Sequence, residues 1–362
     1  MVKDEARGAA ERLTGLDLAR SLAVFGMILV NYKIAMGAEA GGPPWLAAAA
    51  GLLEGRSSAV FVMLAGIGLS LMTRRARQGE AGELRRSRTV IRKRALYLLL
   101  LGIGLLLAGW SADILHYYAL YLFLGSFLIR APSGALLVWT AGLLVCAQGQ
   151  LLLLDYRTGW DPAFHQYLDF WTPEGFLRNL WFNGYHPMLP WFAFFVFGMW
   201  LGRLSLRDEA VRRRGLLVSL GVGFLSEATA FAARSASIPY LDEEGAAYLF
   251  GTKPMPPGLF YMLSAGGTAA AVILLCLYAA DRLQESALAA RLIPAGQMAL
   301  THYVLHVIAG LGLLELLGAL ENGSLPFALL YGTGYYAAAL LLSGRWLNRF
   351  GRGPFESLMR RL

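Results

Sequence analysis

The stretch LDLARSLAVFGMILVNYKIAM, residues 16–36, is long and apolar enough to cross a bilayer, yet it carries several polar side chains. A helix of about 20 residues spans a hydrocarbon layer that is roughly 30 Å thick. Asp17 and Arg20 lie near one end of the stretch, and Asn31 and Lys33 lie toward the other. An ionisable side chain at the centre of such a helix costs about 2.5–3.5 kcal/mol. The stretch therefore predicts a membrane helix whose polar residues have a partner or a function.

Apolar segments of similar length recur along the whole chain. Hydrophobic residues make up 57% of the sequence and charged residues 15%, against roughly 45–50% and about 25% in soluble domains. We therefore expect an all-α, polytopic integral membrane protein that forms a single domain over residues 1–362. The ten expected spans are 17–36, 57–73, 95–110, 112–129, 133–154, 190–202, 215–233, 258–280, 293–318 and 325–343.

The basic residues indicate an orientation in the membrane. The net charge is +8, and most Arg and Lys residues fall in alternate loops, as cytoplasmic loops do. Both termini are therefore expected to be cytoplasmic, with segment 1–16 and the basic tail 344–362 on that side. The basic loops would also attract anionic membrane lipid, and this account leaves no role for nucleic acid. Arginine far outnumbers lysine, which suggests a bacterial protein of the cytoplasmic (inner) membrane.

The largest outer segment, 155–189, is rich in aromatic residues. It is expected to be extracytoplasmic, either as an anchoring belt at the interface or as a lip that binds substrate. Its end, NGYHPMLPWF (183–192), holds His186 and Trp191, which are placed to meet a substrate arriving from outside. A cap or interface role is the alternative for His186.

Arg20 and Asn31 share one face of the first helix. Eleven residues make almost three turns and separate the two positions by about 16 Å. Asp17 precedes Arg20 by three residues, a spacing that permits an ion pair. Arg20 could simply snorkel toward the interface and Asn31 could join two helices, so the residues alone leave function and structure open.

Two further segments place histidines in apolar surroundings. In DILHYY (113–118), Asp113 and His116 are three residues apart, so the carboxylate could orient the imidazole, although such a pair is also a common structural contact. In GQMALTHYVLH (296–306), His302 and His306 lie one turn apart. The glutamate of an HExxH motif is absent and no cysteine is near, so we expect no metal. Hydrogen bonding between helices is the alternative role for this pair.

Several segments in order carry a family resemblance. The first half, with RLTGLDLARSLAVFGMILVN (12–31), AVFVMLAGIGLSL (59–71) and RKRALYLLLLGIGLLL (92–107), resembles the catalytic domain of the heparan-alpha-glucosaminide N-acetyltransferase family. The later half, with LPWFAFFVFGMWLGR (189–203) and GPFESLMRR (353–361), is similar to bacterial YeiB-like membrane proteins. Both groups belong to a transmembrane acyltransferase superfamily.

The resemblance implies specific roles. Arg20 aligns with an arginine of type 3 acyltransferases, and Asn31 stands where their histidine is. The sugar N-acetyltransferases also carry asparagine there and place a catalytic histidine in the following loop, but that loop here, 37–58, has no histidine. His306 matches a Tyr-x-x-His element and becomes the first candidate for the base, with His302 and His186 as further candidates.

The expected activity is transfer of an acyl group, acetyl above all, from cytosolic acyl-CoA to a hydroxyl or amine of an extracytoplasmic glycan or lipid. Arg20 and the cluster from Arg92 to Arg94 would hold the CoA phosphates, and Asn31 would polarise the thioester or orient the acceptor. Arg56, Asp113, His116 and Trp191 would bind substrate. A transporter or lipid-handling protein that kept the fold without acyl transfer is the alternative, and a homodimer is left open.

Overall fold

The computed structural model describes residues 13–39, 41–162, 164–283 and 286–362, and it is all-α, as the sequence predicts. Residues 1–12 of the expected N-terminal segment lie outside the described part. The helices are α2 (Thr14–Ala35), α3 (Pro44–Gly51), α4 (Arg56–Met72), α5 (Arg74–Arg77), α6 (Glu83–Leu107), α7 (Leu115–Gly125), α8 (Ser133–Leu153), α9 (Pro173–Arg178), the π-helical η1 (Asn179–Asn183), α10 (Met188–Leu201), α11 (Glu209–Phe250), α12 (Leu259–Arg282), α13 (Ala289–Gln297), α14 (Ala299–Leu305), the π-helical η2 (His306–Leu311), α15 (Gly312–Leu316), α16 (Leu325–Phe350) and α17 (Pro354–Arg360).

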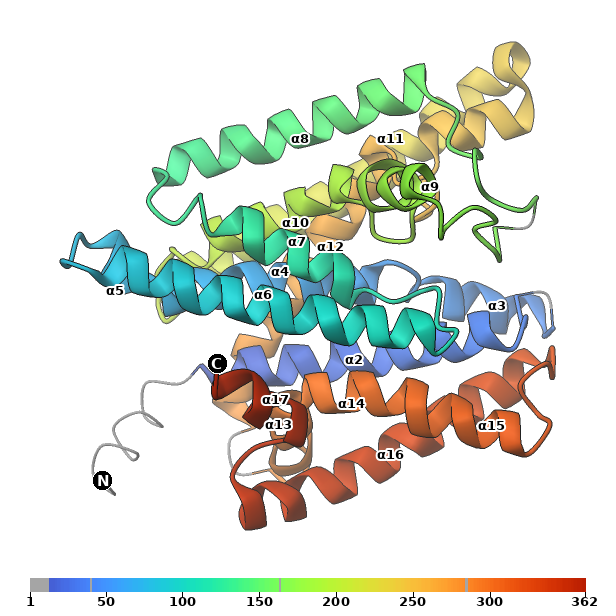
Figure 1. Ribbon diagram of the computed structural model, residues 1–362. Coiled ribbons are helices and arrows are strands. Elements are labelled where there is room, and N and C mark those ends of the chain that lie inside the picture. Colours follow the sequence, from blue (N-terminus) through green and yellow to red (C-terminus); the bar gives the residue numbers. More distant parts are fainter. Residues whose placement is uncertain (1–12, 40, 163, 284–285) are drawn as a thin grey trace.

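Helix α2, which contains the opening stretch, is the central helix of the molecule (Figure 1). It packs against α4, α12, α13 and α16, so polar residues on several of its faces meet protein instead of lipid. Asp17 is 1% exposed and Asn31 8% exposed. The centre of the bundle is thus where the costly polar groups of this helix find partners.

The crossing of α4 and α10 is close because both helices carry glycine at the contact. A Cβ at Gly198 would lie 2.2 Å from the Met63 carbonyl oxygen, and one at Gly66 would lie 2.0 Å from that of Phe195. Small residues let the backbones of membrane helices approach in this way. The pair fixes α10 against α4 near the middle of the bundle.

Seven helical segments in the described residues are long and apolar enough to cross a membrane, by length and composition. They correspond to seven of the ten expected spans, with α3 and α4 taken together and with α14, η2 and α15 taken together. The other three expected spans, 95–110, 112–129 and 190–202, differ in the structure, so the total of about ten stays a prediction. The segments are Thr14–Ala35, Pro44–Met72, Ser133–Leu153, Glu209–Phe250, Leu259–Arg282, Ala299–Leu316 and Leu325–Phe350.

Those three spans are changed in length. Helix α6 begins at Glu83 and includes the basic run that was expected to be loop, because arginine and leucine are both good helix formers. Helix α7 has only 11 residues, about 16 Å, which is too short for the hydrocarbon layer. Helix α10 has 14 residues and is buried over most of its length. Helices α7 and α10 are thus inner elements surrounded by longer ones.

The expected span 215–233 is part of a much longer helix. Helix α11 covers 42 residues, but its helical backbone is interrupted at Asp242. Its first part, residues 209–241, is about 50 Å long and still extends beyond a hydrocarbon layer. Asp208 caps its start by accepting a hydrogen bond from the Ala210 amide at 2.8 Å. Near its end, Tyr248 packs against a buried cluster of Leu151, Tyr156 and Phe182, and its hydroxyl donates to the Leu151 carbonyl oxygen of α8 at 3.1 Å.

The aromatic segment 155–189 is a folded cap, and three of its aromatic residues are buried. Tyr156 is 1% exposed, Trp160 6% and Phe182 5%. The Trp160 indole donates to the Asn183 carbonyl oxygen at 2.6 Å, and the Asn183 amide donates to the Tyr156 carbonyl oxygen at 2.9 Å. The segment therefore forms a wall over the bundle, with α9 at the end of the molecule opposite α5 and α17 (Figure 1).

The C-terminal segment 344–362 is also structured. Helix α16 continues to Phe350, and α17 folds back against α14. There the Glu356 carboxylate accepts hydrogen bonds from the amide and the hydroxyl of Thr301, at 3.0 and 2.5 Å. Burial raises the pKa of the Glu356 carboxyl above its usual value, although these hydrogen bonds oppose the rise. The expected tail is thus part of the bundle surface.

Candidate active site

Asn31 and His306 meet in the centre of the bundle. The Asn31 side-chain nitrogen lies 2.9 Å from His306 Nε2, and both residues are buried. His306 begins the π-helical turn η2, whose first carbonyl oxygen accepts a hydrogen bond from the Tyr32 hydroxyl at 3.1 Å. Such turns within α-helices are frequent at functional sites. The two residues singled out on α2 and α14–η2 are therefore partners.

Asp113 and His116 form a second buried pair beside the first. His116 Nδ1 lies 2.9 Å from Asp113 Oδ2, which also accepts the His116 backbone amide at 3.0 Å. The Tyr303 hydroxyl donates to Asp113 Oδ1 at 3.2 Å and accepts from the Ile114 amide at 3.0 Å. Tyr303 thus joins this pair to the helix that carries His306. We call Asn31, Asp113, His116, Tyr303 and His306 the central cluster.

The two imidazoles of the cluster, His116 and His306, differ in the hydrogen-bond partners of their Nε2 atoms. His306 Nδ1 faces the Tyr303 carbonyl oxygen, which can only accept, so Nδ1 carries the proton and Nε2 accepts from Asn31. His116 Nδ1 donates to Asp113, and its Nε2 is buried with no hydrogen-bond partner among the described residues. An imidazole oriented by a carboxylate, with Nε2 available, has the arrangement of a general base.

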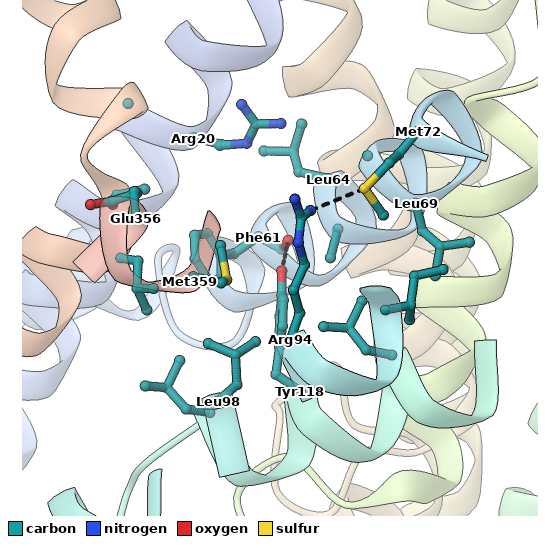
Figure 2. A pocket seen from close by; sticks show the side chains of 18 of the residues that line it. Arg20, Phe61, Leu64, Leu69, Met72, Arg94, Leu98, Tyr118, Glu356 and Met359 are labelled. Carbon is teal, nitrogen blue, oxygen red and sulfur yellow. Dashed lines mark hydrogen bonds between the residues drawn. The ribbon is translucent and has the colours of Figure 1, made fainter. Parts of the chain in front are cut away.

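A cavity of about 450 Å³ is lined by residues of α2, α4, α6, α7 and the segment 296–300 (Figure 2). We call it the Arg20 cavity. Figure 2 shows Arg20 and Arg94 reaching toward it from α2 and α6, with Phe61, Tyr118 and Glu356 also in its lining. The Arg94 Nη1 contacts the Met72 sulfur at 3.0 Å, and its Nε is buried with no hydrogen-bond partner among the described residues. An unpartnered buried guanidinium nitrogen favours an anionic ligand here.

A second cavity of about 810 Å³ adjoins the first and shares Arg20, Gly68 and Met72 with it. Its lining adds Arg74, Arg75 and Arg207, so we call it the Arg75 cavity. Guanidinium groups match phosphate oxygens in bidentate fashion. The arginines around these two cavities therefore suit a ligand with several phosphates and an extended apolar arm.

A third cavity of about 750 Å³ lies under the aromatic segment. We call it the Trp110 cavity. Trp110 packs edge-on against the His306 ring at 6.2 Å between centroids, and Phe170 packs edge-on against His116 at 6.4 Å. Further rings in its lining are Trp160, Tyr167, Trp171 and Tyr185.

Three chain segments connect these cavities through the central cluster. Helix α2 runs from Arg20 through Asn31 to Ile34, about 21 Å in all. The segment from Leu300 to Val307 passes through Tyr303 and His306, and that from Trp110 to Tyr118 passes through Asp113 and His116. In each segment one end lines the Arg20 cavity and the other the Trp110 cavity.

Other predicted site residues lie elsewhere. His302 Nε2 is 2.7 Å from the Ser343 hydroxyl, which itself donates to the Ala339 carbonyl oxygen, so His302 joins α14 to α16. It therefore does not share a ligand position with His306. Arg92 is exposed and lies over the rings of Phe123 and Phe127, at 5.7 and 5.0 Å from their centroids.

Three more predicted residues are outside the cluster. Trp191 is fully buried and packs edge-on against the His186 ring at 4.6 Å between centroids. Arg56 lies in a separate cavity and pairs with Glu227 at 2.5 Å. By contrast, the ion pair expected between Asp17 and Arg20 does form, at 2.5 Å.

His186 gives a prediction about pH. Burial lowers the pKa of its imidazole to about 3, and the nearby His116 lowers it further while Asp113 opposes this. Below pH 6.5 the unfolded chain takes up a proton at this position and the folded chain does not, so stability is lost as the pH falls toward 3, by up to about 1.4 kcal/mol per pH unit. We expect His186→Phe to lessen the fall in melting temperature between pH 7 and pH 5, measured by thermal unfolding in detergent. The exposed His165→Gln is the control, and an unchanged pH dependence in His186→Phe would contradict the assignment.

Sequence reasoning missed several lining residues. Trp110 and Glu356 are common residue types near helix ends, and no spacing marks them. Arg74 and Arg75 were recognised only as members of a basic loop. Their positions depend on how α5 and α17 pack, which no local pattern encodes.

The fold and the cluster define a multi-pass membrane protein with a buried polar centre between two cavities. The model of the family described as "Heparan-alpha-glucosaminide N-acetyltransferase, catalytic" matches residues 12–241, and the chain belongs to this family. A second model, described as "Protein of unknown function (DUF418)", matches residues 204–362. Both expected resemblances are thereby confirmed, and membership indicates a membrane acetyltransferase that uses acetyl-CoA. Neither a search of curated proteins nor a search of solved structures returned a match.

Proposed function

We propose that this protein transfers an acetyl group from acetyl-CoA in the Arg20 cavity to a hydroxyl or amine in the Trp110 cavity. One observation carries the proposal: three segments, α2, α7 with its preceding loop, and α14–η2, each connect the two cavities. At one end each segment lines the Arg20 cavity, in its middle it contributes to the central cluster, and at its other end it lines the Trp110 cavity. A reaction centre between two cavities lets donor and acceptor approach from opposite sides. Positioning of this kind is a large part of catalysis in group transfer.

The donor side is argued from charge. Arg20 lies at the junction of the Arg20 and Arg75 cavities, and Arg94 lines the Arg20 cavity. The phosphates of acetyl-CoA would bind Arg74, Arg75 and Arg20, and the pantetheine arm would follow the apolar Arg20 cavity toward the cluster. The predicted positive-inside orientation puts this end in the cytoplasm of a bacterial cell, where acyl-CoA is available.

The reaction needs a base for the acceptor. The acceptor oxygen or nitrogen attacks the thioester carbonyl carbon, the carbon–sulfur bond breaks, and the acceptor proton passes to His116 Nε2 and then to the CoA sulfur. Asp113 holds His116 in the required tautomer and stabilises the imidazolium. Asn31 would polarise the thioester carbonyl, with His306 orienting its side-chain amide through their 2.9 Å hydrogen bond.

His116 is preferred over His306 as the base because of hydrogen bonding. The Nε2 lone pair of His306 is occupied by Asn31, whereas that of His116 is free of a partner among the described residues. His116 also compensates for the histidine that the loop 37–58 lacks. The Trp110 cavity, lined by aromatic rings, suits the apolar face of a sugar acceptor on the extracytoplasmic side.

A direct test uses purified protein with radiolabelled acetyl-CoA. We expect acetyl-CoA at millimolar concentration to raise the melting temperature and label to move to an acceptor fraction. A transporter or lipid-handling protein would move its cargo without forming free CoA. Failure of every acyl-CoA to stabilise the protein would count against the enzyme.

Arg94 and Arg92 form a matched pair for the donor site. We expect Arg94→Ala to weaken acetyl-CoA binding by about 10–100-fold, since a hydrogen bond to a charged group contributes about 1.5–3 kcal/mol. Arg92→Ala, two residues away on the exposed face, should bind normally. Binding is measured by calorimetry in detergent, and equal losses in both variants would show that the basic run of α6 acts only through its overall charge.

A further inference from the structure

A fourth cavity of about 1030 Å³ lies apart from the central cluster, between α3, α4, α11 and α12. We call it the Arg56 cavity. It combines a charged floor with an apolar rim, a combination that the reaction at the cluster does not require. Its lining holds three cationic and three anionic side chains: Lys33, Arg56 and Lys253, and Glu39, Glu54 and Glu227.

The charged floor is a connected network. The Arg56 guanidinium donates to Glu227 at 2.5 Å and to the Ser264 hydroxyl at 3.1 Å. Glu227 also accepts from the Thr252 hydroxyl at 2.9 Å and from Ser264. The Glu227 side chain is still 43% exposed, so it keeps contact with the cavity. A balanced set of charges of this kind suits a zwitterionic or neutral polar headgroup better than a polyanion.

The rim of the cavity is apolar and open to the side. Leu52 is 66% exposed, Phe224 73% and Leu275 48%. The charged floor lies where helices end, since Lys33 is in the last turn of α2, Arg56 begins α4 and Thr252 follows α11. The ends of spanning helices lie near the headgroups, so we place the charged floor at that level and the apolar rim beside the adjoining acyl chains.

The Arg56 cavity adjoins the Trp110 cavity. Glu39 lines the first and His165 lines the second, and the Glu39 carboxylate is 3.8 Å from His165 Nε2. The Glu39 side chain is 41% exposed and the His165 side chain 53%. Their contact therefore lies at the surface, between the Arg56 cavity and the Trp110 cavity. A headgroup in one cavity can therefore extend to the other by displacing one exposed side-chain contact.

We propose that the acceptor is a membrane amphiphile that enters sideways through the Arg56 cavity, an inference that rests on the proposed acetyl transfer. Its hydrocarbon chains lie along the rim formed by α11 and α12. Its headgroup contacts the Arg56–Glu227 network, and a hydroxyl or amine of that headgroup reaches the Trp110 cavity past Glu39 and His165. A soluble glycan would need neither the apolar rim nor the balanced charges.

The test uses two glycine variants of α11. A Cβ at Gly223 would lie 3.8 Å from its nearest neighbours, the Ser264 carbonyl oxygen and the Thr268 amide nitrogen, so a side chain can begin at this position without a clash. Gly223 lines the cavity, and Gly223→Phe is designed to fill it. Gly221 has open space around it and does not line the cavity, so Gly221→Phe is the matched control. For photolabelling, each protein is placed in phosphatidylcholine vesicles that contain a phosphatidylethanolamine with a photoreactive acyl chain. For acetyl transfer, each protein is incubated in a separate experiment with a bacterial lipid extract and radiolabelled acetyl-CoA.

We expect photolabelling on α11 and α12, and transfer of acetyl to the lipid fraction, in the wild type and in Gly221→Phe. Both should fall about tenfold or more in Gly223→Phe, which corresponds to about 1.4 kcal/mol of lost binding. Equal labelling of the two variants, or acetylation only of a headgroup analogue without chains, would overturn the lateral site. Stabilisation by acetyl-CoA, measured on the same proteins, reports on the donor site alone, so its absence would reject the proposed function and not merely the lipid acceptor.

Discussion

Replacing His116 with glutamine is expected to lower the rate of acetyl transfer by about 10²–10⁴-fold while leaving the affinity for acetyl-CoA unchanged. This is the usual contribution of a positioned general base. His116 Nδ1 is fixed by Asp113 at 2.9 Å, and its Nε2 has no other task among the described residues. The variant should lose the proton transfer and keep the donor cavity, which His116 does not line. Rates are measured with saturating radiolabelled acetyl-CoA.

His302→Gln is the matched control for this experiment. His302 is buried, like the cluster histidines, but its Nε2 pairs with the Ser343 hydroxyl of α16, 2.7 Å away. Its replacement should affect stability more than the chemical step. A variant His116→Gln with the wild-type rate, together with an inactive His306→Gln, would transfer the role of base to His306.

Asp113 adds a second readout for the same assignment. Asp113→Asn should keep the shape of the pair but favour the wrong tautomer of His116, and so lower kcat with little change in KM for acetyl-CoA. Loss of kcat in Asp113→Asn without loss in His116→Gln would show that Asp113 acts through Tyr303 instead. The Tyr303 hydroxyl donates a hydrogen bond to Asp113 Oδ1 at 3.2 Å.

Filling the donor path is expected to abolish acetyl-CoA binding without unfolding the protein. Gly68 lines both the Arg20 and the Arg75 cavities, and a Cβ at this position would meet no atom within 4 Å. A phenylalanine there would occupy the junction through which the phosphates and the pantetheine arm must connect. We expect Gly68→Phe to show no thermal stabilisation at about 1 mM acetyl-CoA, where the wild type is stabilised, and no transfer activity.

Gly104→Phe on α6 serves as the control, because Gly104 is exposed and also has open space around it. Both variants should have melting temperatures close to that of the wild type in the absence of ligand. Normal binding of acetyl-CoA by Gly68→Phe would mean that the donor does not pass this junction. Parallel loss in Gly104→Phe would indicate a general effect of a ring on the membrane helices.

The sequence anticipated features that depend on neighbours along the chain. The ion pair of Asp17 with Arg20 and the pair of Asp113 with His116 both join residues three apart, and the helix period alone brings such residues together. Most of the expected spans also correspond to helices, since apolar length is a local property. The family resemblance, carried by ordered motifs, likewise needed no coordinates.

The sequence-based predictions of helix bounds and of donor-site residues were wrong where local sequence patterns conflict or where packing decides. The basic run before 95 was expected to be loop, but helix propensity continued α6 through it. Helix α7 was expected to cross the membrane, yet it is short and buried among longer helices. Arg92 and Arg94 were treated alike, although a difference of two residues in a helix turns a side chain by about 200°, so only Arg94 reaches the Arg20 cavity.

The sequence by itself determined an all-α chain with apolar segments of membrane length, the polar face of α2, and the family. Only the tertiary structure decided that Asn31 meets His306, 275 residues away, that His302 does not, and that the Arg20 and Trp110 cavities lie on opposite sides of one cluster. The physical reason is the separation along the chain between the residues that interact. Helix period and apolar length are properties of neighbouring residues, whereas a buried polar atom takes whichever partner the packing of distant helices brings within about 3 Å of it.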